Sequence, residues 1–318
     1  MSEKKQTFST DIRPYGKAAI TEAIDWIGRG EPVAVPTETV YGLAADATNG
    51  EAVARIYAAK GRPSFNPLIV HVRDLDHARA LGDFSDAAHA VALRWWPGPL
   101  TLVVPRRVDG PLADLATAGL SSVALRCPAH PAMRDLIAAS GKPLAAPSAN
   151  ASGTISPTRA EHVLKTLGGR IPLIIDGGDT EHGLESTIVA FTGAEARLLR
   201  PGPIVFQDIL AVAGLPAGPE TARIEAPGQM ESHYAPSKPV RLDATDRQPG
   251  EWLIGFDQIA GDTTLSTTGD LVEAAARLFG ALHQAEEVTP CRIAVAPIPH
   301  EGLGAAINDR LRRAAAPR

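Results

Sequence analysis

The sequence predicts an α/β protein with two domains. Short buried strands alternate with amphipathic helices through residue 215, which is typical of a single α/β domain. Residues 216–238 contain several Pro and Gly and interrupt this alternation. A chain of 318 residues has room for about two domains. We therefore predict a catalytic domain over 1–215, a linker over 216–238 and a smaller α/β domain over 239–318.

Composition and charge restrict the classes of protein. The chain is 44% hydrophobic and 21% charged, as in soluble globular proteins, and its net charge of −5 gives no global attraction for nucleic acids. The two cysteines, Cys127 and Cys291, are far apart, which favours a reduced, cytoplasmic compartment. The polar N-terminus does not look like a signal peptide, and we expect no membrane segment.

The first elements lead to a pair of cations. We expect a helix over 16–28, a strand over 33–35, a helix over 51–60 and a strand over 68–72. Lys60 ends the second helix and Arg62 follows it, and both side chains suit phosphate or carboxylate oxygens. Cations are also favourable at a helix C-terminus for structural reasons, so these residues alone leave both interpretations open. Thr37 and Thr39 after the first strand are equally ambiguous between ligand binding and local capping.

Further polar residues follow later strands. We expect helices over 86–95 and 131–140 and strands over 100–104 and 121–128, the last carrying Arg126 near its end. The natural partner of this buried arginine is a carboxylate, either internal or from a ligand. A short strand then ends at Pro147, and Ser148, Asn150 and Ser156 follow within nine residues. These neutral side chains suit the rim of a nucleotide site, although turns and a helix N-cap also explain them.

The remaining elements complete both domains. Strands over 173–175 and 198–200 and a helix over 205–213 end the first domain. Strands over 252–256 and 292–297 and helices over 271–283 and 303–314 form the second. Arg310, Arg312 and Arg313 are interpreted as favourable charges at the end of the last helix rather than as an RNA contact.

The sequence lacks the motifs of several common chemistries. It contains no P-loop, no dinucleotide fingerprint, no nucleophile elbow and no zinc-binding His pair. The polar side chains at strand ends are instead four cations, Lys60, Arg62, Arg126 and Arg200, among hydroxyl and amide groups. Such a set binds a polyanion and stabilises charge that develops at phosphorus, with positioning as the main catalytic device.

Five motifs, in order, carry a resemblance to a known family: residues 36–43, 60–68, 96–101, 147–150 and 186–187. Together they resemble the YrdC-like threonylcarbamoyl-adenylate synthases over about residues 15–215. The segments 233–236 and 302–310 are similar to the long form of that family. The resemblance implies a twisted, open mixed sheet with flanking helices, followed by a smaller Rossmann-like α/β domain.

The resemblance also implies a reaction. L-Threonine, bicarbonate and ATP would give threonylcarbamoyl-AMP and pyrophosphate, the first step of N6-threonylcarbamoyladenosine (t6A) modification of tRNA. The enzyme would be a cytoplasmic nucleotidyltransferase. Magnesium would accompany ATP through its phosphates, with no metal ligand from protein side chains. The partner would be a downstream threonylcarbamoyl-transferase complex acting on tRNA, with weak RNA binding by the chain itself as a further expectation.

The resemblance assigns residues to each substrate. Four of them form the family's core catalytic cluster: Lys60, Arg62, Ser148 and Asn150. The residues expected around ATP are Lys60, Ser64, Ser122, Ser148, Ser156, Arg200 and Tyr234, the last as part of a linker lid. The residues expected around threonine are Thr37, His71, Arg126, Ala146 and Ser186, with Arg126 binding the carboxylate.

Two other functions are alternatives to the synthase. Basic residues along one concavity are compatible with a module that binds double-stranded RNA or tRNA, but the net charge of −5 argues against it. A carbamoyl-transfer domain like those of hydrogenase-maturation proteins would need acylphosphatase and zinc-finger segments, and the sequence shows neither.

Overall fold

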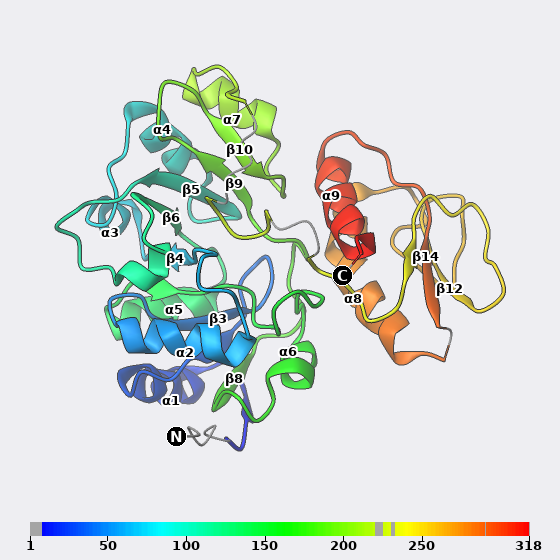
Figure 1. Ribbon diagram of the computed structural model, residues 1–318, viewed down its shortest axis with the longest axis horizontal. Helices are drawn as coiled ribbons and strands as arrows, with labels where there is room; N and C mark the ends of the chain where they lie inside the picture. Colours follow the sequence, from blue (N-terminus) through cyan, green and yellow to red (C-terminus); the bar gives the residue numbers. More distant parts are fainter. Residues whose placement is uncertain (1–7, 220–224, 230–232, 290, 318) are drawn as a thin grey trace.

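The computed structural model describes residues 8–219, 225–229, 233–289 and 291–317, which form two α/β domains (Figure 1). The larger contains a ten-stranded sheet with the order β1-β8-β2-β3-β7-β4-β6-β5-β9-β10. Its strands are β1 (Asp11–Pro14), β2 (Val33–Val35), β3 (Gly42–Asp46), β4 (Ile69–His71), β5 (Leu100–Pro105), β6 (Ser122–Arg126), β7 (Leu144–Ala145), β8 (Leu173–Asp176), β9 (Thr187–Ala190) and β10 (Arg197–Arg200). Its helices are α1 (Lys17–Gly28), α2 (Gly50–Lys60), α3 (Leu75–Arg79), α4 (Asp86–Trp95), α5 (Pro131–Ser140), α6 (Ala160–Leu167) and α7 (Phe206–Ala213), with a 3₁₀ turn at Asp114–Thr117.

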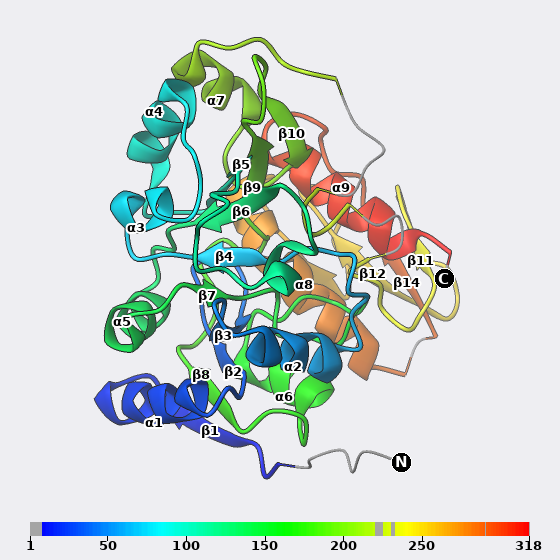
Figure 2. The same ribbon diagram turned by 60° about the vertical axis from the view of Figure 1, so that its left-hand side comes forward.

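The large sheet is mixed, as the resemblance implied. Strands β4 and β6 are parallel, as are β5 and β9, whereas β7 runs antiparallel to both β3 and β4. Helices α1 and α7 lie at opposite ends of the sheet (Figure 2). This arrangement confirms the predicted fold class of the first domain.

Two strands of this sheet were not predicted from the sequence. Strand β1 follows a polar N-terminal segment and is exposed along its length, so no buried apolar pattern marks it. Strand β3 consists of Gly, Leu, Ala, Ala and Asp, which have low strand propensity and show no alternation. It forms because it is buried between β2 and β7, where tertiary packing outweighs local preference.

Helices α2 and α4 pack on one face of the sheet, and helices α1 and α5 together with part of the linker pack on the other. Side chains of α2 and α4 pack with Val70, Leu102 and Leu125 in the main core. Alternate residues of the same strands point the opposite way, as the two-residue period of a strand requires. Among these, Ile69 and Ala124 pack in a separate cluster that includes Ala226 of the linker.

The smaller domain contains a parallel sheet with the order β11-β14-β12-β13, which confirms the Rossmann-like prediction. Its elements are β11 (Val240–Arg241), β12 (Glu251–Gly255), β13 (Thr263–Thr264), α8 (Leu271–Glu287), β14 (Arg292–Val295) and α9 (Leu303–Ala315). Helices α8 and α9 lie on the side of this domain that faces the large one (Figure 1). No helix within the described residues has the length and apolar character needed to cross a membrane.

The two domains share one apolar core. Val40, Ile155 and Leu184 of the large domain pack in the same cluster as Leu278 and Phe279 of α8. At Gly183 the chain runs so close to α8 that an added Cβ would lie 2.4 Å from the carbonyl oxygen of Ala276. The two domains therefore meet by direct backbone approach, with no room for a larger side chain at this point.

This close approach predicts a specific effect of Gly183→Ala. We expect a loss of about 2–4 kcal/mol in the free energy of unfolding, because left-handed strain adds to overlap with α8. Gly141→Ala is the matched control, since Gly141 has the same φ of 65° as Gly183 but no atom within 4 Å of the added Cβ. Urea unfolding of both variants tests this, and equal losses would contradict close domain contact at Gly183.

Candidate active site

Helix α2 places Lys60 beneath the loop that follows β7. The helix begins where Asn49 Oδ1 accepts hydrogen bonds from the Glu51 and Ala52 amides, and it ends at Gly61 with a φ of 61°. The Lys60 ammonium donates to the carbonyl oxygens of Ser148 at 2.6 Å and Asn150 at 2.5 Å, and to Asn150 Oδ1 at 3.3 Å. A buried cation therefore fixes the loop at residues 148–150.

Two further buried cations are also held by carbonyl oxygens. Arg62 donates to the carbonyl oxygens of Asn66 at 3.3 Å and Pro67 at 3.0 Å. Arg200 donates from Nε to the carbonyl oxygen of Ser186 at 3.1 Å and from Nη2 to the Ser186 hydroxyl at 3.1 Å. Within the described part of the chain, no carboxylate forms an ion pair with Lys60, Arg62 or Arg200.

The crowding of positive charge is reflected in the pKa values. Burial, followed by the charge of Arg62, holds the pKa of the Lys60 ammonium well below its usual value. Burial is also the main reason that the pKa of Arg62 falls to about 10, with a further contribution from Arg200. Lys60 and Arg62 have no carboxylate ion pair among the described residues, whereas the charge of Glu185 opposes the fall in the pKa of Arg200. The environment of Lys60 and Arg62 therefore favours the binding of a negatively charged ligand.

Arg126 differs because it has an internal carboxylate partner. It donates to Glu38 Oε1 at 2.6 Å and to Thr39 Oγ1 at 2.9 Å, and both members of the ion pair are buried. Its neighbour across the parallel β4–β6 pair is His71, where burial, followed by the charge of Arg126, lowers the pKa to about 3. His71 is therefore neutral at physiological pH.

A second buried carboxylate links the two domains. Glu185 accepts a hydrogen bond from the Ser156 hydroxyl and another from Arg310 Nε at 2.8 Å. Arg310 belongs to α9, is fully buried and lies before the last turn, so its interpretation as a favourable charge at the helix end was wrong. The helix places it on the inward-facing side, where the otherwise isolated charge of Glu185 requires a cation.

The described part of the linker closes the site. Tyr234 is 1% exposed and packs against Phe279 of α8 and beneath the guanidinium of Arg310. The amide of the next residue, Ala235, donates to the carbonyl oxygen of Gly153 at 2.9 Å. Tyr234 has a φ of 62°, which is uncommon for a residue with a large side chain. Neighbouring contacts hold the linker in this conformation over the site.

A cavity of about 40 Å³ remains beneath the linker. Its wall includes Arg62, His71, Arg126, Ala146, Ser148, Arg200 and Tyr234, all of them predicted site residues. Four other predicted residues lie directly behind this wall: Lys60, Asn150, Ser156 and Ser186. Lys60, Ser156 and Ser186 each form a hydrogen bond with a residue that lines the cavity, and Asn150 accepts one from Lys60.

Three predicted residues are placed elsewhere. Ser64 is exposed on its loop, and Ser122 lies at the far end of β6 from Arg126, so neither lines the cavity in the part of the chain described. The Thr37 hydroxyl donates to the carbonyl oxygen of Val40 at 2.7 Å and accepts from the Val40 amide at 3.3 Å. Thr37 thus makes the local capping contacts that the sequence left open, and Thr39 lines the cavity in its place.

Glu38, Glu185 and Arg310 were not among the predicted site residues, and Thr39 was left open between ligand binding and capping. One sequence feature indicated them: a buried arginine at a strand end requires a carboxylate partner. Glu38 lies within the motif at residues 36–43, and Glu185 directly precedes the motif at residues 186–187. Neither could be paired with its arginine, because the partners are 88 and 125 residues apart in sequence.

Comparisons with known proteins identify the family. A family model described as "Telomere recombination" (Sua5, YciO and YrdC) matches residues 25–202, and a model described as "Threonylcarbamoyl-AMP synthase, C-terminal domain" matches residues 204–316. The chain belongs to the Sua5/YrdC family. The resemblance found from the sequence motifs is thereby confirmed, and the second match places the chain with members that carry the additional domain.

Relatives of this family match along nearly the whole chain. Threonylcarbamoyl-AMP synthase of Bacillus subtilis is 40% identical, covering 96% of this chain and 95% of its own. The structure of Pyrococcus abyssi Sua5 complexed with L-threonine matches with a TM-score of 0.86 and 36% identity, covering 97% of each chain. Escherichia coli YciO shares the fold of the first domain, with a TM-score of 0.55 and 18% identity over 64% of this chain and all of its own.

The Glu38–Arg126 pair predicts how stability depends on pH. Burial alone would raise the pKa of Glu38, but Arg126 and the backbone donors outweigh it and hold the pKa below its ordinary value of 4.5. The lowered pKa means that the pair contributes stability above pH 4.5, which is lost as pH falls through the folded-state value. We expect Glu38→Gln to cost about 3–5 kcal/mol at pH 7, because Arg126 keeps a buried, unpaired charge.

Urea unfolding as a function of pH measures this effect. The Glu38→Gln, Arg126→Met double variant should recover much of the loss, since it removes both charges. Glu22→Gln, which breaks an exposed ion pair with Arg13, is the control and should change little. A Glu38→Gln protein as stable as the wild type at pH 7 would contradict the assigned pairing.

Proposed function

We propose that this chain synthesises threonylcarbamoyl-AMP from L-threonine, bicarbonate and ATP, releasing pyrophosphate as the first step of t6A modification of tRNA. The observation that carries the proposal is the group of three buried cations, Lys60, Arg62 and Arg200, which have no carboxylate partner among the described residues. They lie at or behind the wall of one cavity closed by the linker. Family membership and the name of the relatives give this anion site its substrate.

The chemistry requires little beyond positioning and charge. The unprotonated threonine amine attacks the carbon of bicarbonate, and a C–O bond breaks so that one oxygen leaves as water with a proton from the amine. A carboxylate oxygen of the resulting carbamate then attacks the α-phosphorus of ATP, and the bond to the departing pyrophosphate breaks. Negative charge gathers on phosphate oxygens, where Lys60, Arg62 and Arg200 act most strongly because the site is closed to water. His71, which is neutral because of its low pKa, adds no further cation.

The two substrates are assigned to neighbouring parts of the cavity. We place ATP beside four residues: Lys60, Arg62, Ser148 and Arg200. Ser156, in the loop that begins at Ser148, supports this part of the site from behind, and Tyr234 covers the nucleotide. We place threonine beside His71, Arg126 and Ala146, with its carboxylate near the Arg126 guanidinium. Glu38 already neutralises part of that charge, so Arg126 orients the amino acid more than it attracts it.

Magnesium is proposed to enter with ATP and to neutralise part of the phosphate charge. Within the described residues, no group of three or more His, Cys, Asp or Glu side chains is arranged to hold a metal ion. The metal would therefore be held mainly by phosphate oxygens. We further propose a cytoplasmic location, transfer of the product to a downstream tRNA-modifying complex, and weak RNA binding at most.

Pyrophosphate release tests the proposed function directly. The full-length protein should release pyrophosphate from ATP only when both threonine and bicarbonate are present. Release that is indifferent to threonine would overturn the proposal, and stimulation by carbamoyl phosphate would favour carbamoyl transfer instead. Strongly salt-dependent RNA binding without ATP turnover would favour the RNA-binding alternative.

Removal of either central cation should slow the reaction. We expect Lys60→Ala and Arg62→Ala each to lower kcat/KM by about a hundredfold or more, because charge stabilisation in a dry site is lost. Lys17→Ala, at an exposed position of α1, is the control. Urea midpoints close to the wild type confirm that the variants fold, and near-normal rates in them would refute the assigned roles.

The position of Tyr234 over the site predicts that its substitution changes nucleotide binding. Tyr234→Ala should weaken ATP binding or accelerate loss of the adenylate about tenfold or more, because the aromatic ring closes the site. Tyr234→Phe keeps the ring and should retain most of the affinity, because the buried ring rather than the hydroxyl covers the site. Nucleotide titration and product-release kinetics measure both, and an unchanged Tyr234→Ala protein would exclude a lid role.

A further inference from the structure

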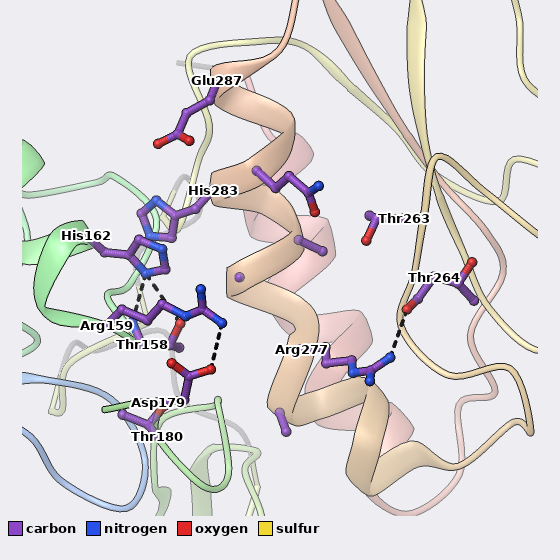
Figure 3. A pocket seen from close by; sticks show the side chains of 14 residues that line it. Thr158, Arg159, His162, Asp179, Thr180, Thr263, Thr264, Arg277, His283 and Glu287 are labelled. Carbon is purple, nitrogen blue, oxygen red and sulfur yellow. Dashed lines mark hydrogen bonds and ion pairs between the residues drawn. The ribbon is translucent and has the colours of Figure 1, made fainter. Parts of the chain in front are cut away.

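Two histidines from different domains stack against each other outside the cavity. His162 of α6 and His283 of α8 have ring centroids 3.7 Å apart and an interplanar angle of 16° (Figure 3). His283 is 5% exposed, whereas His162 is half-buried beside an interdomain cleft of about 480 Å³. The stack is a direct side-chain contact between the two domains.

Hydrogen bonds define the protons on both rings. His283 Nε2 lies 3.1 Å from the carbonyl oxygen of Ser156, and because a carbonyl only accepts, this nitrogen carries the proton. His162 Nδ1 accepts from the amide of Thr158 at 3.3 Å, so this nitrogen is unprotonated. As neutral imidazoles, both rings fulfil these bonds with the proton on Nε2.

Ser156 therefore connects to the small domain in two ways. Its carbonyl oxygen accepts from His283 of α8, and its hydroxyl donates to Glu185, which is paired with Arg310 of α9. One bond holds the main chain and the other holds the side chain of Ser156, which belongs to the loop that begins at Ser148. The position of this loop thus depends on contacts from the second domain.

The charged groups around the pair disfavour protonation. Burial is the main cause that lowers the pKa of His162 to about 4, and Arg159 and Lys165 lower it further. Burial and the neighbouring His162 lower the pKa of His283 to about 3, with Lys165 adding to this and Glu287 opposing it. Arg277 of α8 and Asp179, which is paired with Arg159, complete the charged lining of the cleft.

We propose that His283 is a positioning residue for ATP, holding the Ser156 loop through its Nε2–H while His162 orients its ring by stacking. This inference rests on the proposed function, in which Ser156 belongs to the ATP side of the site. It assigns part of nucleotide binding to a residue of the second domain that does not line the cavity. We expect threonine binding near Arg126 to change little, because His283 forms no hydrogen bond to Arg126, His71 or Glu38.

Steady-state kinetics of the full-length chain test the proposal. His283→Phe keeps an aromatic ring for the stack and removes the donor, so we expect KM for ATP to rise about tenfold, while KM for threonine stays within about twofold. His283→Gln restores a side-chain N–H donor and should recover part of the affinity. His300→Phe, at an exposed position of the same domain, is the matched control.

A second measurement reports positioning without turnover. Hydrogen exchange should accelerate in residues 150–158 of His283→Phe, with protection restored in His283→Gln. Unchanged exchange and an unchanged KM for ATP would overturn the proposal, as would equal losses for ATP and threonine, which indicate general destabilisation. Failure of the wild type to release pyrophosphate would refute the proposed function instead, and the exchange data would still decide whether His283 holds the loop.

Discussion

The structure depends on the burial of positive charge without a matching carboxylate. Lys60, Arg62 and Arg200 leave water for a site where backbone carbonyl oxygens are their main partners. Carbonyl dipoles satisfy the N–H donors but do not neutralise the charge, and burial consequently lowers the pKa of all three groups. A site with this imbalance is most stable when an anion occupies it.

The need to keep these buried cations away from water explains the role of the second domain and the linker. Charge stabilisation is strong only where water is excluded, and the face of a sheet is open unless something covers it. Here Tyr234 covers the site, and Arg310 and His283 hold the large domain at Glu185 and Ser156. The small domain thus supplies contacts that keep the site closed, and the apolar cluster that it shares with the large domain holds it in place.

Sequence reasoning recovered the fold class, the family and seven of the fifteen residues that line the cavity. It succeeded where local pattern carries the information, as in the helix that ends at Lys60 and the polar loop after Pro147. It failed for β3, whose alanines form a strand only because neighbours bury them. It also failed for Glu38, Glu185 and Arg310, because distant partners, not nearby residues, determine which charges are buried together.

Proton uptake on ATP binding tests the central claim most directly. If an anion relieves the buried charge, the phosphates raise the lowered pKa of Lys60, and binding takes up protons at any pH where part of the free protein holds Lys60 as the neutral amine. Calorimetric titrations in buffers of different ionisation enthalpy, at about pH 8–9.5 where ATP is fully ionised, measure this number. We predict net uptake in the wild type and a smaller value in Lys60→Met. Binding without proton uptake across this range, or equal uptake in both proteins, would contradict the account.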